Sequence, residues 1–305
     1  MRKIILNFAL LLFGFAVYAQ QDAQYTQYMY NTINVNPAYA GSRGVLSVFG
    51  LYRTQWVGLE GAPDTGAFSL NTPIDNSNLG LGLSFVNDRI GPTSENMISA
   101  DVSYTIPTSE SYKLSFGLKG TANLFNLDKD KLTIKDQGDL ALQSYNYFSP
   151  NVGAGVYFHS DKLYLGLSVP NILETKRFKD TDTEDISLYV ERMNAYFIGG
   201  YVFDLSSTLK FKPAFLAKAV QGAPLQLDVS GNFLFNEKFV LGAAWRWDAA
   251  MSAMAGFQIT PGLFAGYGYD LETTKLRKYN SGSHEVFLRF ELFSKPEKIV
   301  SPRFF

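Results

Sequence analysis

The residue types that most often mark a catalytic or metal site, histidine and cysteine, are scarce in this chain. The 305 residues include two histidines and no cysteine, which excludes thiolate zinc sites, cysteine nucleophiles and disulfides. The hydrolase elbow G-x-S-x-G is also missing, because its nearest match, GLSVP at residues 166–170, lacks the second glycine. Nothing in the sequence pattern pairs His159 or His284 with a serine nucleophile, so we expect ordinary solvated or interfacial roles for both. The sequence therefore predicts no catalytic site, no metal site and no cofactor.

Six charged residues form a better candidate for a functional surface. Each lies in a segment where polar and apolar residues alternate, so in a β-strand all six would point to the polar face. One interpretation is a charge lattice that stiffens and hydrates the lumen of a barrel. The other is a docking surface for a plug or a partner segment. The six residues are Asp101, Asp228, Arg246, Asp270, Arg289 and Glu291.

Two further ligand classes are disfavoured by charge. Calcium loops of the D-x-D-x-D-G type are missing, and three lysines dilute the carboxylates of the segment 128–139, which we expect to be a solvated loop. The 27 basic residues nearly balance the 28 acidic ones. The chain therefore offers no basic field for nucleic acid.

The elements that position these residues have a two-residue period. In 225–235, Leu225, Leu227, Val229, Phe233 and Phe235 share one face, and the other face is polar. The segments 98–106, 239–247 and 286–292 alternate in the same way. This period predicts β-strands.

A membrane barrel explains these strands better than a soluble β-sandwich does. The segments run for about 8–11 residues, the length of a tilted spanning strand. Aromatic residues make up 15% of the chain and end many apolar faces, as interfacial girdles do. Only 18% of residues are charged, and no internal apolar run is long enough for a spanning helix. The polar faces suit a wet or plugged lumen and would spoil the core of a sandwich.

The fold class is therefore all-β, a transmembrane antiparallel β-barrel of about 14 strands. Connections from even to odd segments are short, whereas those from odd to even include the long ones. Short periplasmic turns and long external loops are typical of outer-membrane barrels, and an even strand number returns both termini to the periplasm. Pro213 lacks a ladder donor and predicts a local irregularity. The predicted strands are 44–53, 65–72, 79–88, 95–106, 112–123, 148–158, 162–169, 193–203, 208–219, 225–235, 238–247, 250–259, 262–271 and 284–293.

The regions outside the barrel are short. Residues 1–19 have a basic start, an apolar stretch and a small-residue cleavage site, which predict a signal peptide; an uncleaved anchor helix is the alternative. Residues 20–43 form a periplasmic N-terminal segment, the barrel spans 44–293, and 294–305 are a C-terminal tail.

Several motifs, spread along the chain, resemble those of the PorP/SprF family, which comprises outer-membrane barrels of the type IX secretion system. They begin with QYTQYMYN (24–31) and NVNPAYAG (34–41), continue through NLGLGLSFVNDRIGPTSE (78–95) and LSFGLKG (114–120), and end with GYGYDLETTKL (266–276) and GSHEV (282–286). Between them lie SPNVGAGVYFHSDKLYLGLSVPNIL (149–173) and GAPLQLDVSGNFLFNEKFVLGAAWR (222–246). The family often has GYSYD where this chain has GYGYD.

The resemblance implies a role for the barrel in secreting or anchoring one particular cargo protein. Such a partner is adhesin-like and carries a type IX C-terminal sorting domain; other type IX components and outer-membrane lipid are the further expected partners. The resemblance implies no enzymatic activity. From the residues alone, a passive porin and a barrel enzyme acting on lipid or glycan stay open as alternatives, the enzyme being disfavoured by the missing constellation.

The N-terminal segment contains the remaining candidate residues. Asn36-Pro37 initiates a turn, and Gly41 releases the backbone into the first strand. One hypothesis is a structural latch that covers the barrel mouth with tyrosine rings, including Tyr30 and Tyr39. The other is a plug or partner contact within the lumen. Either explains why so many rings are tolerated there, because tyrosine joins apolar area to a hydroxyl that needs a partner.

Overall fold

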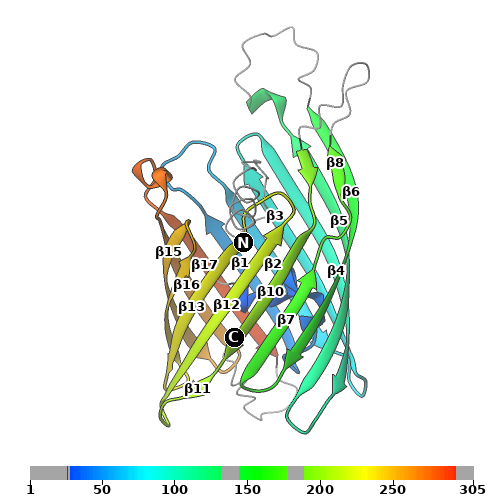
Figure 1. Cartoon of the computed structure of the whole chain (residues 1–305), viewed down its shortest axis with the longest axis vertical. Coiled ribbons are helices and arrows are strands. Elements are labelled where there is room, and N and C mark those ends of the chain that lie inside the picture. Colours follow the sequence, from blue (N-terminus) through cyan, green and yellow to red (C-terminus); the bar gives the residue numbers. More distant parts are fainter. Residues whose placement is uncertain (1–25, 27, 132–143, 178–188, 293–305) are drawn as a thin grey trace, which may run out of the picture.

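The computed structural model describes residues 26, 28–131, 144–177 and 189–292. Within these ranges the main antiparallel sheet closes on itself (Figure 1). β1 (Leu46–Thr54) pairs with β17 (Ser283–Leu292), which joins the first strand to the last. β10 (Asn194–Tyr201) pairs with a strand on each side. The fold is therefore a closed barrel of 14 strands, as predicted.

Eleven further strands complete the barrel wall. They are β2 (Asp64–Pro73), β3 (Leu79–Ile90), β4 (Thr93–Pro107), β5 (Lys113–Leu127), β6 (Tyr145–His159), β7 (Leu163–Val169), β12 (Leu209–Val220), β13 (Gln226–Phe235), β14 (Phe239–Arg246), β15 (Ala250–Thr260) and β16 (Leu263–Glu272). Three short strands were not predicted as separate elements, although Phe203 of β11 ends the predicted strand 193–203. β8 (Thr175–Arg177) and β9 (Tyr189–Glu191) form a separate two-stranded sheet, and β11 (Phe203–Asp204) pairs with β12.

The two ends of the barrel differ in their connections. One end, here the short-turn end, carries tight turns such as 74–78, 160–162 and 236–238. The opposite end, here the long-loop end, carries 55–63, 128–144, 170–193 and 273–282. β1 begins and β17 finishes at the short-turn end, where Leu46 pairs with Leu292.

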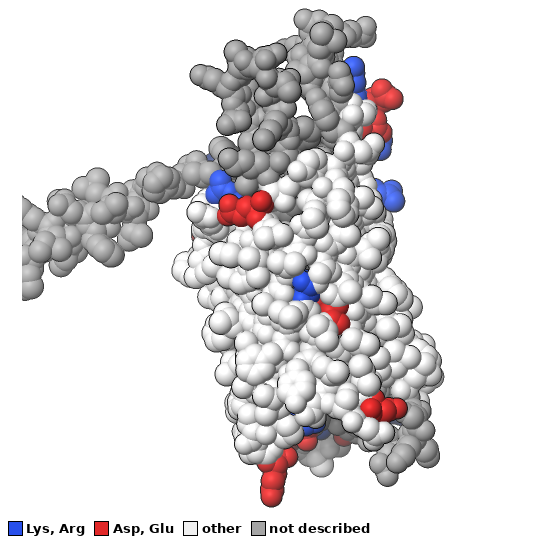
Figure 2. Space-filling model, turned by 90° about the vertical axis from the view of Figure 1, so that its right-hand side faces the viewer, with Lys and Arg blue, Asp and Glu red and all other residues white. Residues whose placement is uncertain are grey.

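The alternation of side chains separates an apolar outer wall from a polar inner wall. In β13, Val229 and Phe233 are exposed on the outside, and Asp228 and Asn232 are buried on the inside. On the face shown in Figure 2, charged side chains are few and most of them lie toward the two ends. This surface suits a hydrocarbon environment, which only a closed sheet or a helix can cross with all its backbone groups paired. Among the described residues, no helix is long and apolar enough to cross a membrane.

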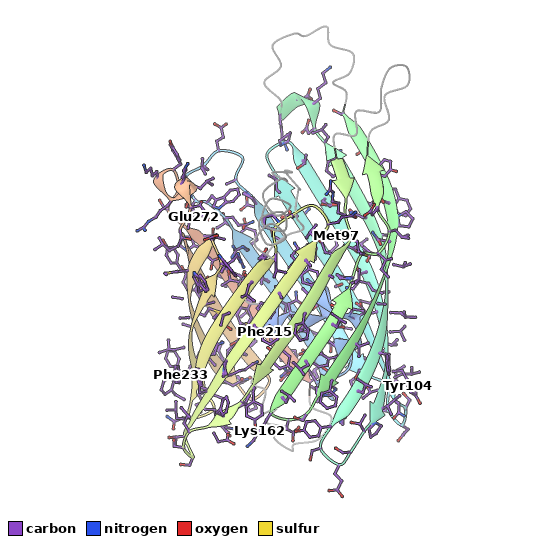
Figure 3. All side chains as sticks on the ribbon, in the orientation of Figure 1. Met97, Tyr104, Lys162, Phe215, Phe233 and Glu272 are labelled. Atoms are coloured by element: carbon purple, nitrogen blue, oxygen red, sulfur yellow. The ribbon has the colours of Figure 1, made fainter. Side chains whose placement is uncertain are left out.

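Aromatic side chains gather on the outer wall near both ends. Tyr104 and Phe233 lie toward the short-turn end (Figure 3), and the Tyr104 hydroxyl accepts a bond from the amide of Asn78, which ends a tight turn. Trp245 and Trp247 stack at 6.4 Å at the long-loop end. Such rings suit the boundary between hydrocarbon and water.

The irregularity predicted at Pro213 occurs in β12. The β10–β12 ladder runs as far as the pair Gly200–Ala214 and resumes at Phe203–Phe211 in β11. Pro213 lies opposite the gap, where its missing N–H costs no ladder bond. The predicted strand 193–203 is accordingly split at Val202.

Three neighbouring strands are longer than predicted. β4, β5 and β6 each run for 15 residues and reach farther toward the long-loop end than the predicted segments 95–106, 112–123 and 148–158. In β5 the extra residues are Leu124, Phe125, Asn126 and Leu127, so apolar side chains fall on both faces, and in β4 and β6 polar residues such as Ser94 and Asn146 are added. The amide of Asn126 in β5 donates to that of Asn146 in β6 at 2.6 Å. The apolar contrast that reveals a strand in sequence is therefore missing there.

Candidate functional site in the barrel lumen

The described part of the N-terminal segment lies inside the barrel. Residues 28–41, here the luminal segment, form η1 (Tyr28–Tyr30), α2 (Thr32–Val35) and η2 (Pro37–Tyr39), and nearly all of their side chains are buried. Figure 1 shows this blue ribbon enclosed by the wall. The segment contacts mainly β3, β4, β5 and β6.

The path of the chain crosses the lumen and does more than cover one mouth. Thr26 bonds to side chains of Asp270 and Glu285, which lie close to the long-loop ends of β16 and β17. Gly41 lies against Pro73 and Gly80, next to the tight turn 74–78. The chain therefore enters β1 from the short-turn end, after passing through the barrel.

The turn predicted at Asn36-Pro37 is held by the wall. The Asn36 side chain accepts a bond from the backbone N–H of Ala38 at 3.0 Å, which caps η2, and Pro37 takes the first helical position. The Nδ2 of Asn36 donates to the carbonyl of Val156 in β6, also at 3.0 Å. Asn36 is fully buried, so one side chain both shapes the segment and attaches it to the barrel.

Glycines on the inner wall make room for this backbone. A Cβ added at Gly117 would collide with the backbone of Pro37 and Ala38, and one at Gly80 would collide with the carbonyl of Ala40. Gly41 has a φ of +70°, in the left-handed region that favours glycine. The inner-wall glycines that approach the luminal segment this closely are Gly80, Gly82, Gly117, Gly155 and Gly166.

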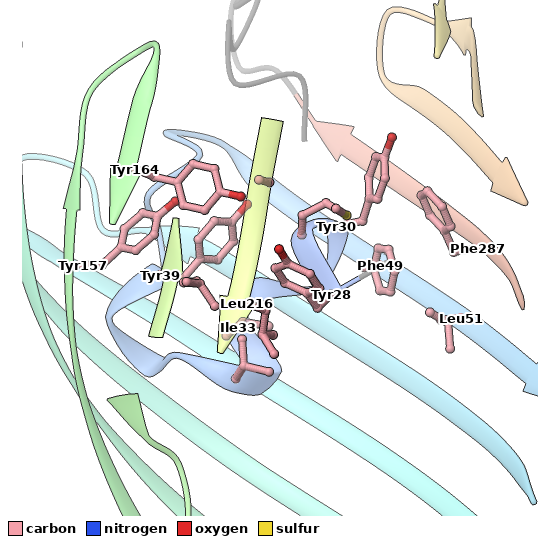
Figure 4. Close-up of a cluster of buried hydrophobic side chains, with 14 of the residues drawn as sticks. Tyr28, Tyr30, Ile33, Tyr39, Phe49, Leu51, Tyr157, Tyr164, Leu216 and Phe287 are labelled. Atoms are coloured by element: carbon pink, nitrogen blue, oxygen red, sulfur yellow. The ribbon is translucent and has the colours of Figure 1, made fainter. Parts of the chain in front are cut away.

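Two aromatic contacts fix the luminal segment laterally (Figure 4). Tyr30 packs on Phe287 and Phe264, with ring centroids 4.4 Å and 5.4 Å apart. Tyr39 meets Tyr157 of β6 edge-on at 5.6 Å. Burial raises the pKa of the Tyr30 phenol above its usual range, so this side chain stays neutral in its apolar surroundings.

A buried ion cluster lies on the long-loop side of the lumen. The Arg53 guanidinium lies 2.7 Å from the Asp270 carboxylate and 3.2 Å from that of Glu285. Thr26 accepts a 2.7 Å bond from Arg53, donates its hydroxyl to Asp270 and donates its backbone N–H to Glu285. The N-terminal chain is thus part of a charge-assisted network.

Three other ion pairs line the inner wall. Asp228 and Arg246, on neighbouring strands, are joined at 2.9 Å. Lys119 contacts Asp101 at 3.2 Å and also donates to the carbonyl of Ile33 in the luminal segment.

The third pair lies toward the short-turn end. Glu291 pairs with Arg43 and lies 3.7 Å from Arg289. The Arg289 guanidinium also lies over the rings of Tyr30 and Phe264, at 5.8 Å and 5.2 Å from their centroids. All six charged residues that were predicted to face the lumen are buried on the inner wall.

Sequence reasoning missed several partners of these residues. The alternation of β5 would have placed Lys119 inside, because Ser115, Gly117 and Thr121 share its face. Arg53 was harder to find, because its inward neighbours Phe49 and Leu51 are apolar.

The described residues include no cluster of the kind that holds a metal ion. Among the residues that the structure describes, no group of three or more His, Asp or Glu side chains converges on one point. His159 is buried next to Tyr157, and His284 bonds to the Tyr267 hydroxyl at 2.6 Å. Residues 1–19 and 294–305 lie outside the described residues, so the signal peptide and the tail stay predictions.

Comparison with known proteins decides the family. Residues 17–290 match the family described as type IX secretion system membrane protein PorP/SprF. The chain belongs to the PorP/SprF family. It is therefore a type IX secretion system membrane protein whose closed barrel lies in the outer membrane, and the family is not an enzyme family.

No curated protein matches this PorP/SprF protein. Solved porin structures are similar to it. The KdgM porin has 6% identity and a TM-score of 0.39, over 81% of this chain and 99% of that chain. The NanC porin has 11% identity and a TM-score of 0.43, over 81% and 100%. A mutant of the Rh. blastica porin has 11% identity and a TM-score of 0.33, over 81% and 99%.

Proposed function

We propose that this PorP/SprF barrel is a non-enzymatic accessory of type IX secretion that exports or retains one or a few cargo proteins. The partner is a secreted, adhesin-like protein with a type IX C-terminal sorting domain. The barrel is oriented in the membrane so that the long-loop end faces the cell exterior and the short-turn end faces the periplasm, as in other outer-membrane barrels.

The observation that carries the proposal is that the lumen is occupied by the protein itself. Residues 28–41 are buried between opposite walls, and their contacts include backbone, side-chain and aromatic partners. A lumen filled in this way favours a protein-binding role over the alternative of a passive porin. The family membership supplies the secretion system in which such a barrel acts.

Deletion of the gene tests the cargo role. We expect the surface proteome to lose one or a few proteins with sorting domains while other type IX cargo is still exported. An unchanged surface proteome would overturn the proposal. In planar bilayers we expect the purified barrel to show no large steady conductance, and an open channel of porin size would favour the alternative.

Removal of residues 21–40 addresses the role of the N-terminal segment. Loss of cargo display from a normally folded barrel would favour a partner contact. Loss of the barrel itself would favour the structural role.

A further inference from the structure

A groove crosses the outer wall of the barrel from β3 to β7. It has a volume of about 720 Å³ and is open on its outer side. The outward side chains that line it are apolar except for one hydroxyl, that of Tyr104. Its lower row follows the register of four successive strand pairs, which join Leu79, Tyr104, Phe116, Val156 and Leu167.

A small side chain hollows the upper part of the groove. Ala154 lies between Leu118 and Val169 in the register of the wall, so a single methyl group separates two larger side chains. After Val169 the chain steps inward, because Pro170 is buried and its carbonyl oxygen lies on the inner side of Gly153. The outer wall is therefore recessed where β7 ends.

The groove rises from one boundary of the membrane to about its middle. Its lower end is at Leu79, where β3 begins beside the tight turn 74–78, and the Tyr104 hydroxyl there bonds to the amide of Asn78. Its upper end is at Val169. From Leu163 to Val169, β7 rises roughly 14 Å at about 3.4 Å per residue and a tilt near 45°, which is about half of an apolar band of about 25 Å. The groove thus spans the depth of one leaflet.

The surroundings of the wall determine what fills this groove. A water molecule in an apolar site needs several polar partners, and the outward side chains offer only the Tyr104 hydroxyl at the lower end. An empty groove would forfeit the dispersion contacts of its lining. A flexible hydrocarbon chain supplies those contacts and needs no polar partner, and the outer membrane provides such chains.

We propose that the groove is a binding site for one acyl chain of a phospholipid in the leaflet at the short-turn end. The head of the lipid lies beside Tyr104 and Asn78, at the height where amphipathic side chains meet the membrane boundary. The chain follows the lower row and ends in the recess beside Ala154 and Val169. The choice of leaflet rests on the orientation in the proposed function, in which the short-turn end is periplasmic, and the groove itself is independent of any cargo.

Photochemical cross-linking maps the chain. The full-length barrel is reconstituted in vesicles of phosphatidylethanolamine and phosphatidylglycerol that contain a small fraction of phosphatidylethanolamine with a diazirine on one acyl chain. The diazirine is placed near the glycerol in one probe and near the terminal methyl group in the other, and the labelled residues are identified by mass spectrometry. We expect the first probe to label Leu79 and Tyr104 and the second to label Val169 and Ile172. The reverse order, or labels spread evenly over the outer wall, would overturn the site.

A filled recess tests whether the site is specific. Ala154→Phe places a ring in the groove, and Ala243→Phe is the matched control, because it places the same ring on the outer face of β14, outside the groove. We expect Ala154→Phe to lower labelling of Val169 and Ile172 by the second probe about five-fold or more, the loss expected when one or two buried methylene contacts are displaced. Ala243→Phe should leave this labelling unchanged.

Equal labelling in the two variants would overturn the inference. If Ala154→Phe does not fold, the labelling map of the natural chain decides alone. Failure of the lipid site leaves the cargo role intact, because gene deletion tests that role separately. An unchanged surface proteome after deletion would remove the cargo role and leave the lipid site standing.

Discussion

Substitution of Asn36 by alanine tests whether the luminal segment is held by the contacts described. Asn36 is buried, and its amide makes two 3.0 Å bonds, one within the segment and one to the wall. Asn36→Ala removes both bonds and leaves the barrel strands unchanged. We expect the segment to undock more often while the wall stays folded.

The expected cost follows from the two bonds. Without the Asn36 oxygen, the buried N–H of Ala38 has no acceptor, which costs about 1–3 kcal/mol. The lost bond to the carbonyl of Val156 contributes about 0.5–1.5 kcal/mol. The free energy of docking should therefore fall by about 1.5–4.5 kcal/mol, which raises the fraction of undocked segment roughly 10- to 1,000-fold.

Thiol labelling measures this fraction, since the natural chain has no cysteine. Thr32→Cys places a small thiol at a buried position of α2, and a water-soluble reagent reaches it only when the segment undocks. Asp75→Cys, in an exposed tight turn, gives the unprotected rate. Asn78→Ala, at an exposed asparagine, is the matched control for the substitution.

We expect Asn36→Ala to accelerate labelling at position 32 by at least ten-fold and to leave the rate at position 75 unchanged. An acceleration of less than about three-fold would refute the energetic reasoning, because the lower bound of about 1.5 kcal/mol already corresponds to roughly ten-fold. A parallel change at position 75 or with Asn78→Ala would show that the effect is not specific to the segment.

Three further substitutions probe the wall. Gly117→Val should displace the luminal segment and produce conductance in planar bilayers. Gly120→Val is the control and should not, because an added Cβ there meets nothing within 4 Å. Equal conductance of the two variants would contradict the packing described. Arg53→Met leaves two buried carboxylates without their guanidinium and should lower the free energy of unfolding by about 3–5 kcal/mol, measured by urea denaturation in detergent; the exposed Arg89→Met should change it by less than about 0.5 kcal/mol. Leu118→Arg on the outer wall should destabilise the barrel in lipid vesicles by about 2–4 kcal/mol, and a neutral result would mean that this face does not contact hydrocarbon.

The wall was predictable from sequence because apolar outward residues and polar inward residues alternate along each lipid-facing strand. Val229 and Phe233 are exposed on the outer wall, whereas Asp228 and Asn232 are buried on the inner wall, and this difference between the two faces produces the alternation in sequence. The prediction became imprecise where this contrast fades. At the long-loop ends of β5 and β6, apolar residues such as Leu124 and Phe125 occupy both faces and the amide of Asn126 pairs with that of Asn146, so the two-residue period is lost.

The site was only partly predictable, because the inner wall is matched to the luminal segment and not to water or lipid. Phe49 and Leu51 face inward because aromatic and apolar side chains pack there. The inner face of β1 therefore looks apolar in the sequence, and the inward position of Arg53 could not be recognised. The sequence does not indicate which face Gly117 occupies, since glycine is neither clearly polar nor clearly apolar. Which residue meets Ala38 is decided by tertiary contact, and a single sequence contains no record of it.

The size of the barrel explains why a segment of the chain occupies it. Side chains alone fill a barrel of about eight strands, but a wall of 14 encloses more space than they can reach. Here the N-terminal chain supplies the missing layer, and its polar groups bond to the wall through Asn36, Lys119 and the Arg53 cluster. Because these bonds are buried, removing residues 21–40 would leave wall groups unpaired and the wall itself weakened. A single substitution such as Asn36→Ala, which loosens the segment and spares the strands, is therefore the sharper way to learn whether cargo contacts the segment or only the rim above it.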